Sequence, residues 1–297
     1  MKAVNETLSA PQHKSFFTEL RKLRTNSKIM ISGILLILFC VVAIFAPWIA
    51  PHDPNVQDLA HRLYEPWGYA KHDGAHFLGT DGFGRDYLSR MIYGARIALL
   101  IGLLVMVIAG LIGVTIGMTA GYFGGAVDHV LMFVINSRLC LPVFLVVMAV
   151  VVVFGPSLSG TVLILGLLQW ERFAIVSRSA TQQIAGSDYI LAAKMLGFSH
   201  WRIIFSEMLP NIASSLIVVA TLEMSWAIIL ESSLSFIGFG VQEPTPSWGL
   251  MLAQAKQYIF FEPWLLYLPG VALVVLVLTI NTFGDGFSQV TEGGLVK

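Results

Sequence analysis

Four histidines lie between the first and second long apolar runs, and imidazole side chains can bind metal ions. They are His52, His61, His72 and His76. Imidazole nitrogens bind zinc, copper and nickel well, but metal sites that are readable from sequence bring their ligands together at short, regular spacings. These four show no such compact spacing. We therefore expect solvated loop histidines and no metal bound by this chain.

The motifs that carry nucleotide or hydrolytic chemistry are missing. No lysine closes a G-x-x-x-x-G-K-[ST] run, so the chain cannot bind ATP through a P-loop. H-E-x-x-H and G-x-S-x-G are also absent. The 18 Lys and Arg residues balance 18 Asp and Glu residues, which argues against an electrostatic nucleic-acid binder. We expect no enzyme, no catalytic residue and no cofactor bound by this chain.

Charged residues inside apolar runs are candidate functional residues, because burying a charge in hydrocarbon is costly. Glu223 lies near the middle of one run, and Glu231 lies at its end. Glu223 either lines a path through the membrane, pairs with another helix, or marks a misplaced boundary. Adjacent residues on a helix point about 100° apart. Glu171 and Arg172 therefore should not pair with each other, and Arg172 is expected to face water.

The composition places the elements that carry these residues in a lipid bilayer. Of 297 residues, 56% are hydrophobic and 12% are charged, whereas about 25% are charged in soluble domains. A helix needs about 20 apolar residues to cross the hydrocarbon core. Runs of that order predict an all-α membrane protein with six transmembrane helices: 29–46, 97–120, a third that ends at residue 154, 161–176, 212–230 and 265–283.

The basic residues predict the orientation. Lysine and arginine gather before the first run, which favours a cytoplasmic N-terminus. Alternation then gives a cytoplasmic N-terminal segment at 1–28, a membrane domain at 29–283 and a cytoplasmic tail at 284–297. Within the domain, residues 47–96 and 232–264 form outer loops and 186–211 form an inner loop.

A stripe of small residues runs along the second expected helix. Ala109, Gly113, Gly117 and Gly121 recur every four residues. Such a stripe lets another helix approach closely when lipid removes the hydrophobic drive for association. The partner is either another helix of this chain, which we favour, or a neighbouring subunit.

The inner segment 186–211 predicts a helix-turn-helix. Ser187 or Asp188 can cap a helix that runs to residue 196, and Gly197 suits the left-handed position after it. Ser199 can then cap a second short helix that ends before Pro210. Spacing places four residues on one shallow face of the first helix, suited to a groove on a partner: Tyr189, Ala192, Ala193 and Leu196.

This segment resembles the EAA loop of ABC importer permeases, in which Glu-Ala-Ala is followed after three residues by Gly and later by Leu-Pro. Ala192, Ala193, Gly197, Leu209 and Pro210 match that pattern, while Leu191 stands in place of the glutamate. Three further stretches resemble the second permease of the peptide and nickel importer family, in the family's order. They are residues 78–86 with 89–90, residues 230–240 with 244–249, and residues 284–286.

The resemblance implies a type I ABC importer permease in a bacterial inner membrane. It implies three kinds of partner besides lipid: a second homologous permease, two ATPase subunits that hold ATP and Mg, and a substrate-binding protein outside. The ATPases would contact the inner loop, with Tyr189, Ala192, Ala193, Leu196, Gly197 and Pro210 as coupling residues. Glu223 and Glu231 become candidates for the translocation path.

The outer motif of the resemblance contains Gly79, Thr80, Asp81, Gly84, Arg85 and Asp86. Its glycines favour tight turns, and its charges either form a salt-bridged plug at the start of the second span or contact the binding protein. Di- or oligopeptides are the expected substrate. Nickel, glutathione and antimicrobial peptides are alternatives within the family, and a stand-alone channel or membrane scaffold is the alternative from another class.

Overall fold

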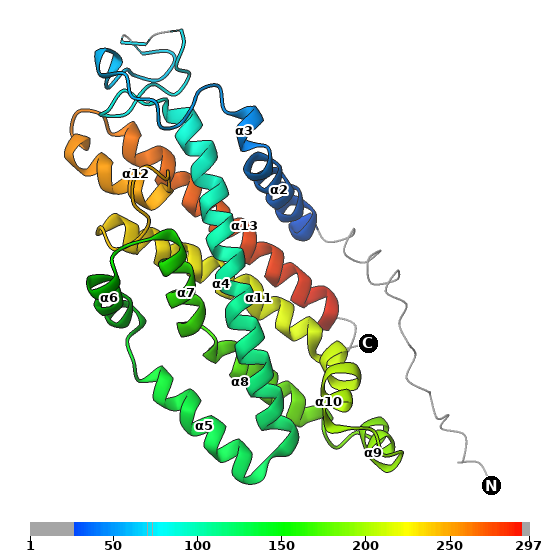
Figure 1. Ribbon diagram of the computed structural model, residues 1–297. Coiled ribbons are helices and arrows are strands. Elements are labelled where there is room, and N and C mark those ends of the chain that lie inside the picture. Colours follow the sequence, from blue (N-terminus) through cyan, green and yellow to red (C-terminus); the bar gives the residue numbers. More distant parts are fainter. Residues whose placement is uncertain (1–26, 70, 73, 293–297) are drawn as a thin grey trace.

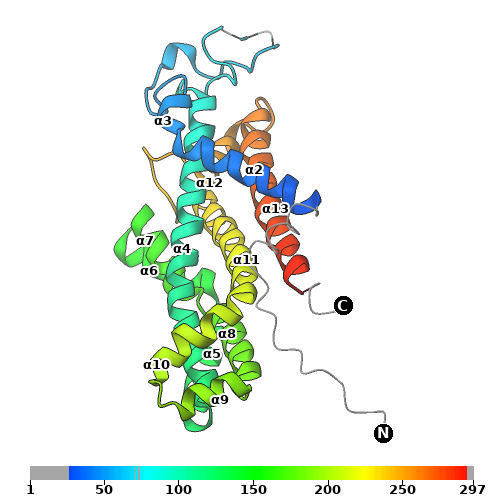
Figure 2. The same cartoon turned by 90° about the vertical axis from the view of Figure 1, so that its right-hand side faces the viewer.

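The computed structural model describes residues 27–69, 71–72 and 74–292, and these residues fold into an elongated helical bundle without a β-strand (Figures 1 and 2). Most of the expected N-terminal segment 1–28 and residues 293–297 of the expected tail 284–297 lie outside the described residues. The main helices are α2 (Ser27–Ile44), α3 (Ala46–Ile49), α4 (Tyr87–Phe123), α5 (Gly125–Leu139), α6 (Val143–Phe154), α7 (Leu158–Leu168), α8 (Glu171–Ile184), α9 (Asp188–Met195), α10 (His200–Arg202), α11 (Leu209–Phe236), α12 (Trp248–Ala255) and α13 (Trp264–Glu292).

The number of spans agrees with the sequence once a broken helix is counted. In the described part, five segments are long and apolar enough to cross a membrane, and α5 with α6 makes a sixth if the bent pair is one span. The bend between α5 and α6 is 74°. Pro142 lies at the bend, and because its nitrogen carries no hydrogen it cannot continue the ladder of α5. The third span is therefore not one straight helix.

The second span begins ten residues earlier than its apolar run suggests. Asp86 caps α4 by accepting a hydrogen bond from the Ser89 amide at 2.8 Å. The first turns of α4 contain the charged residue Arg90, so hydropathy alone does not indicate that they belong to the span. Residues 87–96 lie within the expected outer loop 47–96 and form the helical start of the second span, where the buried Arg90 lies close to Asp81 and Glu243.

The small-residue stripe packs within the chain. Helix α4 makes its most extensive contact with α8. A methyl group added at Gly113 would overlap the Trp170 carbonyl oxygen, and one at Gly117 would overlap that of Ala174. The helices meet backbone to backbone, as small residues in membranes allow, which confirms packing inside the chain.

The inner helix-turn-helix differs from expectation in its second half. The helix that starts at His200 does not end before Pro210, but passes through a π-helical stretch, Ile203–Met208, and continues as α11. Proline has no amide to donate to the preceding turn. The wider π turns accommodate that missing bond without ending the helix.

Two other boundaries also move. Helix α11 extends to Phe236, and the following loop contains α12, which packs on α11 and α13. The residues from 284 to 292, expected to form a tail, continue α13. The last helix thus extends beyond its apolar run, because polar residues can continue a helix.

Candidate functional site: an exposed apolar helix and a buried charged cluster

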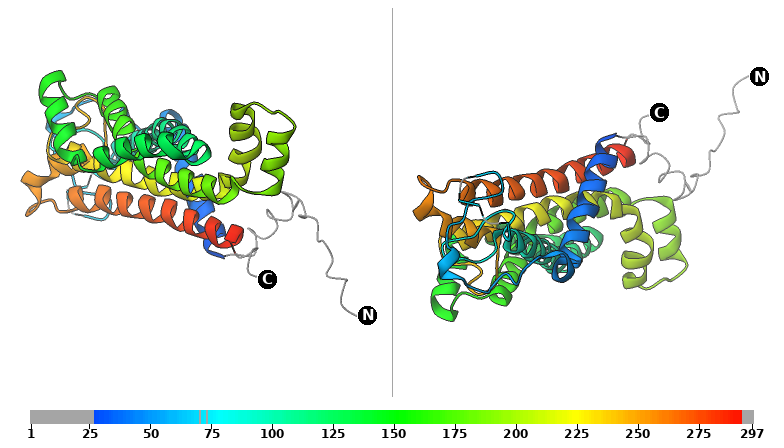
Figure 3. Two further views of the ribbon diagram at one scale, coloured as in Figure 1. Left: turned by 90° about the horizontal axis from the view of Figure 1, so that it is seen from below. Right: turned by 90° about the horizontal axis from the view of Figure 1, so that it is seen from above.

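Helix α9 stands off the side of the bundle, at the end opposite the first outer loop (Figures 2 and 3). Ser187 takes the extended N-cap conformation, although its hydroxyl bonds back to the Ile184 carbonyl at 2.6 Å. Gly197 follows the helix with φ of +76°. The Phe198 amide donates to the Ala193 carbonyl at 3.1 Å, which closes the helix end with a left-handed turn.

The burial of α9 corrects one member of its expected face. Ala193 is buried with Ile190 against the π-helical stretch, whereas Tyr189 and Ala192 are exposed. Met195 and Leu196 are 89% and 73% exposed. Ala193 therefore anchors α9 to its own chain, and the side chains that remain free for a partner form an apolar surface, here the α9 surface: Tyr189, Leu191, Ala192, Met195 and Leu196.

Polar contacts tie this hairpin to the inner end of α4. The hydroxyl of Tyr122 lies 2.9 Å from Nδ1 of His200, and the ammonium of Lys194 lies 4.8 Å from the Tyr122 ring centre. Pro210, by contrast, is exposed at the start of α11. Because α10, the π-helical stretch and α11 are continuous, α9 is joined directly to a helix that reaches the outer loops.

At the outer end, the motif residues converge into one cluster. Gly79 and Gly84 adopt φ of +72° and +73°, and a Cβ at either would overlap backbone of the same loop. The Thr80 hydroxyl bonds to the His61 carbonyl at 2.5 Å and accepts from the Tyr64 amide. The motif glycines therefore allow the loop to fold tightly over the start of α4.

Charges complete this cluster, which we call the outer charged cluster after the loops expected to lie outside: Asp81, Arg85, Arg90, Glu243 and Gln254. Arg85 Nε donates to Asp81 at 2.7 Å, and its Nη1 donates to Glu243 Oε2 at 2.8 Å. Arg90 is fully buried, with Nη2 at 3.4 Å from Glu243 Oε1. Burial acts to raise the pKa of Glu243, but Arg90, Gln254 and Arg85 together lower that pKa below its usual value.

The cluster therefore has the geometry of the expected salt-bridged plug. Glu243 and Gln254 complete it, and the sequence analysis did not single them out. The sequence offers no direct signal for them, since Asp81 and Asp86 equal Arg85 and Arg90 in number. Only the structure shows that Asp86 caps α4, which leaves two buried guanidinium groups in need of more than Asp81 as a counter-charge. The motif side chains are too deeply buried to offer a partner much surface.

The two charged residues of the fourth span find separate partners, as their directions predict. Glu171 lies 3.8 Å from Arg138, which also donates to the carbonyls of Leu168 and Leu141 at the breaks in two spans. Arg172 Nη1 lies 3.3 Å from Glu223 Oε1. The two side chains form an ion pair, but their geometry does not meet that of a hydrogen bond to Oε1. Glu223 is 2% exposed, so it is an interhelical partner, and a role in a path stays a prediction.

Glu231 is surrounded by serine hydroxyls. Ser235 donates to Glu231 Oε1 at 2.6 Å, and its oxygen accepts from the Val241 amide at 2.9 Å. These bonds hold the turn that leads away from α11. A path role for Glu231 also stays a prediction.

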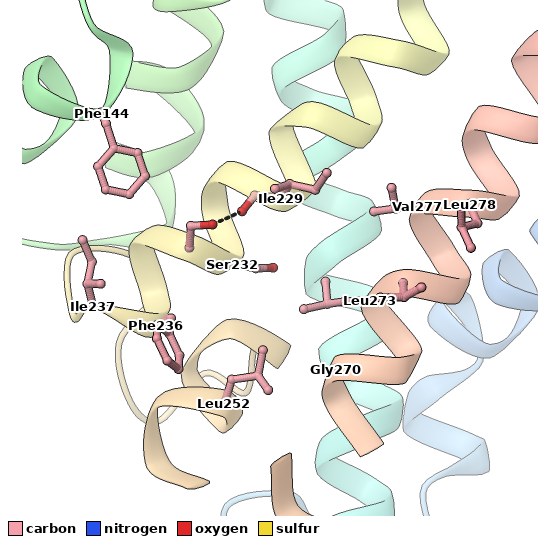
Figure 4. A pocket seen from close by; sticks show the side chains of 12 residues that line it. Phe144, Ile229, Ser232, Phe236, Ile237, Leu252, Gly270, Leu273, Val277 and Leu278 are labelled. Atoms are coloured by element: carbon pink, nitrogen blue, oxygen red, sulfur yellow. Dashed lines mark hydrogen bonds between the residues drawn. The ribbon is translucent and has the colours of Figure 1, made fainter. Parts of the chain in front are cut away.

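An apolar cavity of about 590 Å³ opens between α11 and α13 (Figure 4). Phe144, Ile229, Leu252 and Leu273 are among its lining residues, and Ser232 and Ser233 are its polar ones. Neither Glu223 nor Glu231 lines it. The cavity offers no charge to a polar substrate.

Taken together, fold and site define a multi-pass helical membrane protein that carries an exposed apolar helix at one end and a buried charged cluster at the other. Residues 113–296 match the family described as binding-protein-dependent transport system inner membrane component, and residues 15–66 match the N-terminal TM domain of oligopeptide transport permease C. The chain belongs to this family of ABC transporter permeases, whose members act with ATPase and substrate-binding partners in the inner membrane.

Curated relatives agree over most of the chain. The di/tripeptide transport system permease protein DppC of Pseudomonas aeruginosa (strain UCBPP-PA14) is 40% identical over 258 residues, which cover 87% of this chain and 84% of that protein. The probable D,D-dipeptide transport system permease protein DdpC of Escherichia coli (strain K12) is 34% identical over 261 residues, covering 88% and 86%.

A solved structure agrees in fold. The inward-facing MetNI methionine ABC transporter aligns with a TM-score of 0.56 at 18% identity, covering 67% of this chain and 94% of that chain. At this identity the likeness concerns the helical fold alone. It supports the expected type I importer permease architecture.

Proposed function

We propose that this chain forms one half of the translocation path of an ATP-driven importer for di- or oligopeptides. The observation that carries the proposal is the α9 surface, an exposed apolar helix face held rigidly on the inner end of a family permease. Such a face in water is unfavourable unless a partner covers it. We assign that partner as an ATPase subunit.

The assembly that follows contains this chain, a second homologous permease, two ATPase subunits and an outer substrate-binding protein. Both termini of this chain lie in the cytoplasm. ATP and Mg belong to the ATPase subunits, which carry out hydrolysis, and this chain contributes no catalytic group. Its role is to convert ATPase closure into movement of the spans.

The path of that movement follows the covalent structure. Helix α9 packs through Ile190 and Ala193 on the π-helical stretch, and that stretch continues into α11. A displacement of α9 therefore moves α11, which carries Glu223 and ends at the outer charged cluster. Differential binding of the ATPase dimer to two arrangements of α9 would bias the permease between inward and outward states.

The assignment of a peptide substrate is based on the relatives, two of which are named as permeases for di/tripeptides and D,D-dipeptides. The test is uptake by proteoliposomes that contain the two permeases and the two ATPase subunits. The binding protein is added outside and ATP is enclosed inside. We expect ATP-dependent accumulation of a labelled dipeptide that unlabelled peptides suppress and nickel or glutathione do not. Accumulation of nickel or glutathione without peptide uptake would refute the assignment of peptides as the substrate. The assignment of the chain as an importer permease would still hold.

A further inference from the structure

Three potential metal ligands meet at the outer start of α4, although they are far apart in the sequence. His76 Nδ1 lies 2.9 Å and His52 Nδ1 lies 3.6 Å from the same oxygen of Asp86. One ligand atom from each of the three residues lies within 4.8 Å of the other two. Among the described residues, this is the one group of three His, Cys, Asp or Glu side chains that converges so closely.

We propose that His52, His76 and Asp86 bind a divalent transition-metal ion of the zinc class. Two bonds of about 2.0–2.1 Å at a tetrahedral angle place donor atoms about 3.3 Å apart, and the two donor separations at Asp86 lie on either side of that value. Two imidazoles with one carboxylate suit zinc, copper or nickel, whereas calcium and magnesium prefer oxygen donors alone.

The protein holds these three ligands in place by contacts independent of a metal. The Asp86 side chain is 1% exposed, and its other oxygen is already committed to capping α4 through Ser89. The His52 amide donates to the Ser89 hydroxyl at 3.1 Å. Arg90 Nη1 donates to the Pro54 carbonyl at 3.2 Å, which fixes the chain just after His52.

One side of the group is open. The His52 side chain is 41% exposed, whereas that of His76 is 16% exposed. Three protein ligands with access from solvent leave a fourth position for water or for a group on another molecule. Bound metal would clamp residues 52 and 76 onto the start of α4.

Zinc binding by the full chain in detergent tests the proposal, with an affinity tag that contains no histidine. After removal of metal by a chelator, zinc is returned and its affinity is measured by competition with a fluorescent chelator. We expect one tight zinc ion per chain, and Co²⁺ in its place should give the visible absorption of a low-symmetry N/O site. Loss of one ligand in His76→Ala should weaken binding by at least about 100-fold.

Matched variants separate metal binding from folding. Asp86→Asn retains an N-cap of equal quality and removes the carboxylate ligand, so its metal-free thermal stability should stay close to that of the wild type while zinc binding falls. His61→Asn alters a histidine of the same loop outside the group and should bind zinc normally. If Asp86→Asn fails to fold, the exposed His52→Ala replaces it. Wild-type protein that binds zinc no better than His76→Ala would overturn the proposal.

Discussion

Arg85 Nη1 lies 2.8 Å from Glu243 Oε2, although the two residues are 158 positions apart in the sequence. Their ion pair joins the two outer loops. Arg90 reaches the other oxygen of the same carboxylate from the first turn of α4. A single acidic side chain from the second loop thus contacts both Arg85 and Arg90, which Asp81 also contacts. The outer ends of α4 and α11 are linked through it.

The first prediction concerns Glu243→Gln. The pKa of Glu243 is lower in the folded protein than its usual value of 4.5, so its charge stabilises the fold above that value, and this contribution is lost as the pH falls through the folded pKa. We expect Glu243→Gln to reduce stability by about 1 kcal/mol at neutral pH. The difference from wild type should shrink in acid.

Thermal unfolding in detergent between neutral and acidic pH measures this difference. Glu65→Gln is the control, because Glu65 lies in the first outer loop and accepts a backbone hydrogen bond from Lys71, without an ion pair to any of the described residues. A difference between Glu243→Gln and wild type that grows as the pH falls would contradict the assigned role of the charge.

The second prediction concerns the pair between α8 and α11. Arg172→Leu leaves Glu223 buried without a counter-charge and should cost about 1–3 kcal/mol. Arg172→Leu combined with Glu223→Leu should recover much of that loss, because neither side chain then carries a charge. A double-mutant cycle on unfolding measures the coupling, and strictly additive effects would show that the pair does not interact.

The third prediction concerns the contact of α4 with α8. Gly117→Val should destabilise the chain by about 1–3 kcal/mol, since its side chain has no room beside the Ala174 carbonyl and Ser177. Gly110→Ala is the control, because its added methyl would meet the Phe173 ring at an ordinary contact distance of 3.5 Å. Equal stability of the two variants would be inconsistent with this packing.

The fourth prediction concerns coupling through Gly197. Its φ of +76° is a conformation that a β-branched residue adopts only with strain, so Gly197→Val should cost about 1 kcal/mol or more and reduce ATP-driven uptake severalfold. Gly186→Ala, also in open space but without a positive φ, should leave uptake unchanged. Normal uptake and normal ATPase stimulation in Gly197→Val would count against α9 as a lever.

Much of this architecture could be predicted because the signals are local. The turn at Gly197, the cap at Ser199 and the glycine stripe depend on neighbours or on helical spacing, and the structure contains all three. The start of α4 at Tyr87 could not be read from hydropathy. It depends on Asp86 as a cap and on counter-charges from a distant loop.

Long-range partners account for the rest. The position of Glu243 beside Arg85 and the approach of His52 to His76 both depend on how the two outer loops fold, and nothing in their local spacing indicates it. Ala193 and Ala192 look equivalent in the sequence, yet only Ala193 faces the π-helical stretch. Which side of a short helix is buried is decided by the surface on which it packs.

Site-specific cross-linking shows whether the α9 surface docks on an ATPase subunit. In a background without Cys40 and Cys140, a single cysteine is placed at Met195, which is 89% exposed on α9, or at Phe260, which is 91% exposed beyond α12. The account predicts that Met195→Cys captures an ATPase subunit in the assembled complex and that Phe260→Cys does not. Capture from Phe260→Cys, or none from Met195→Cys in an assembled, ATP-hydrolysing complex, would contradict it.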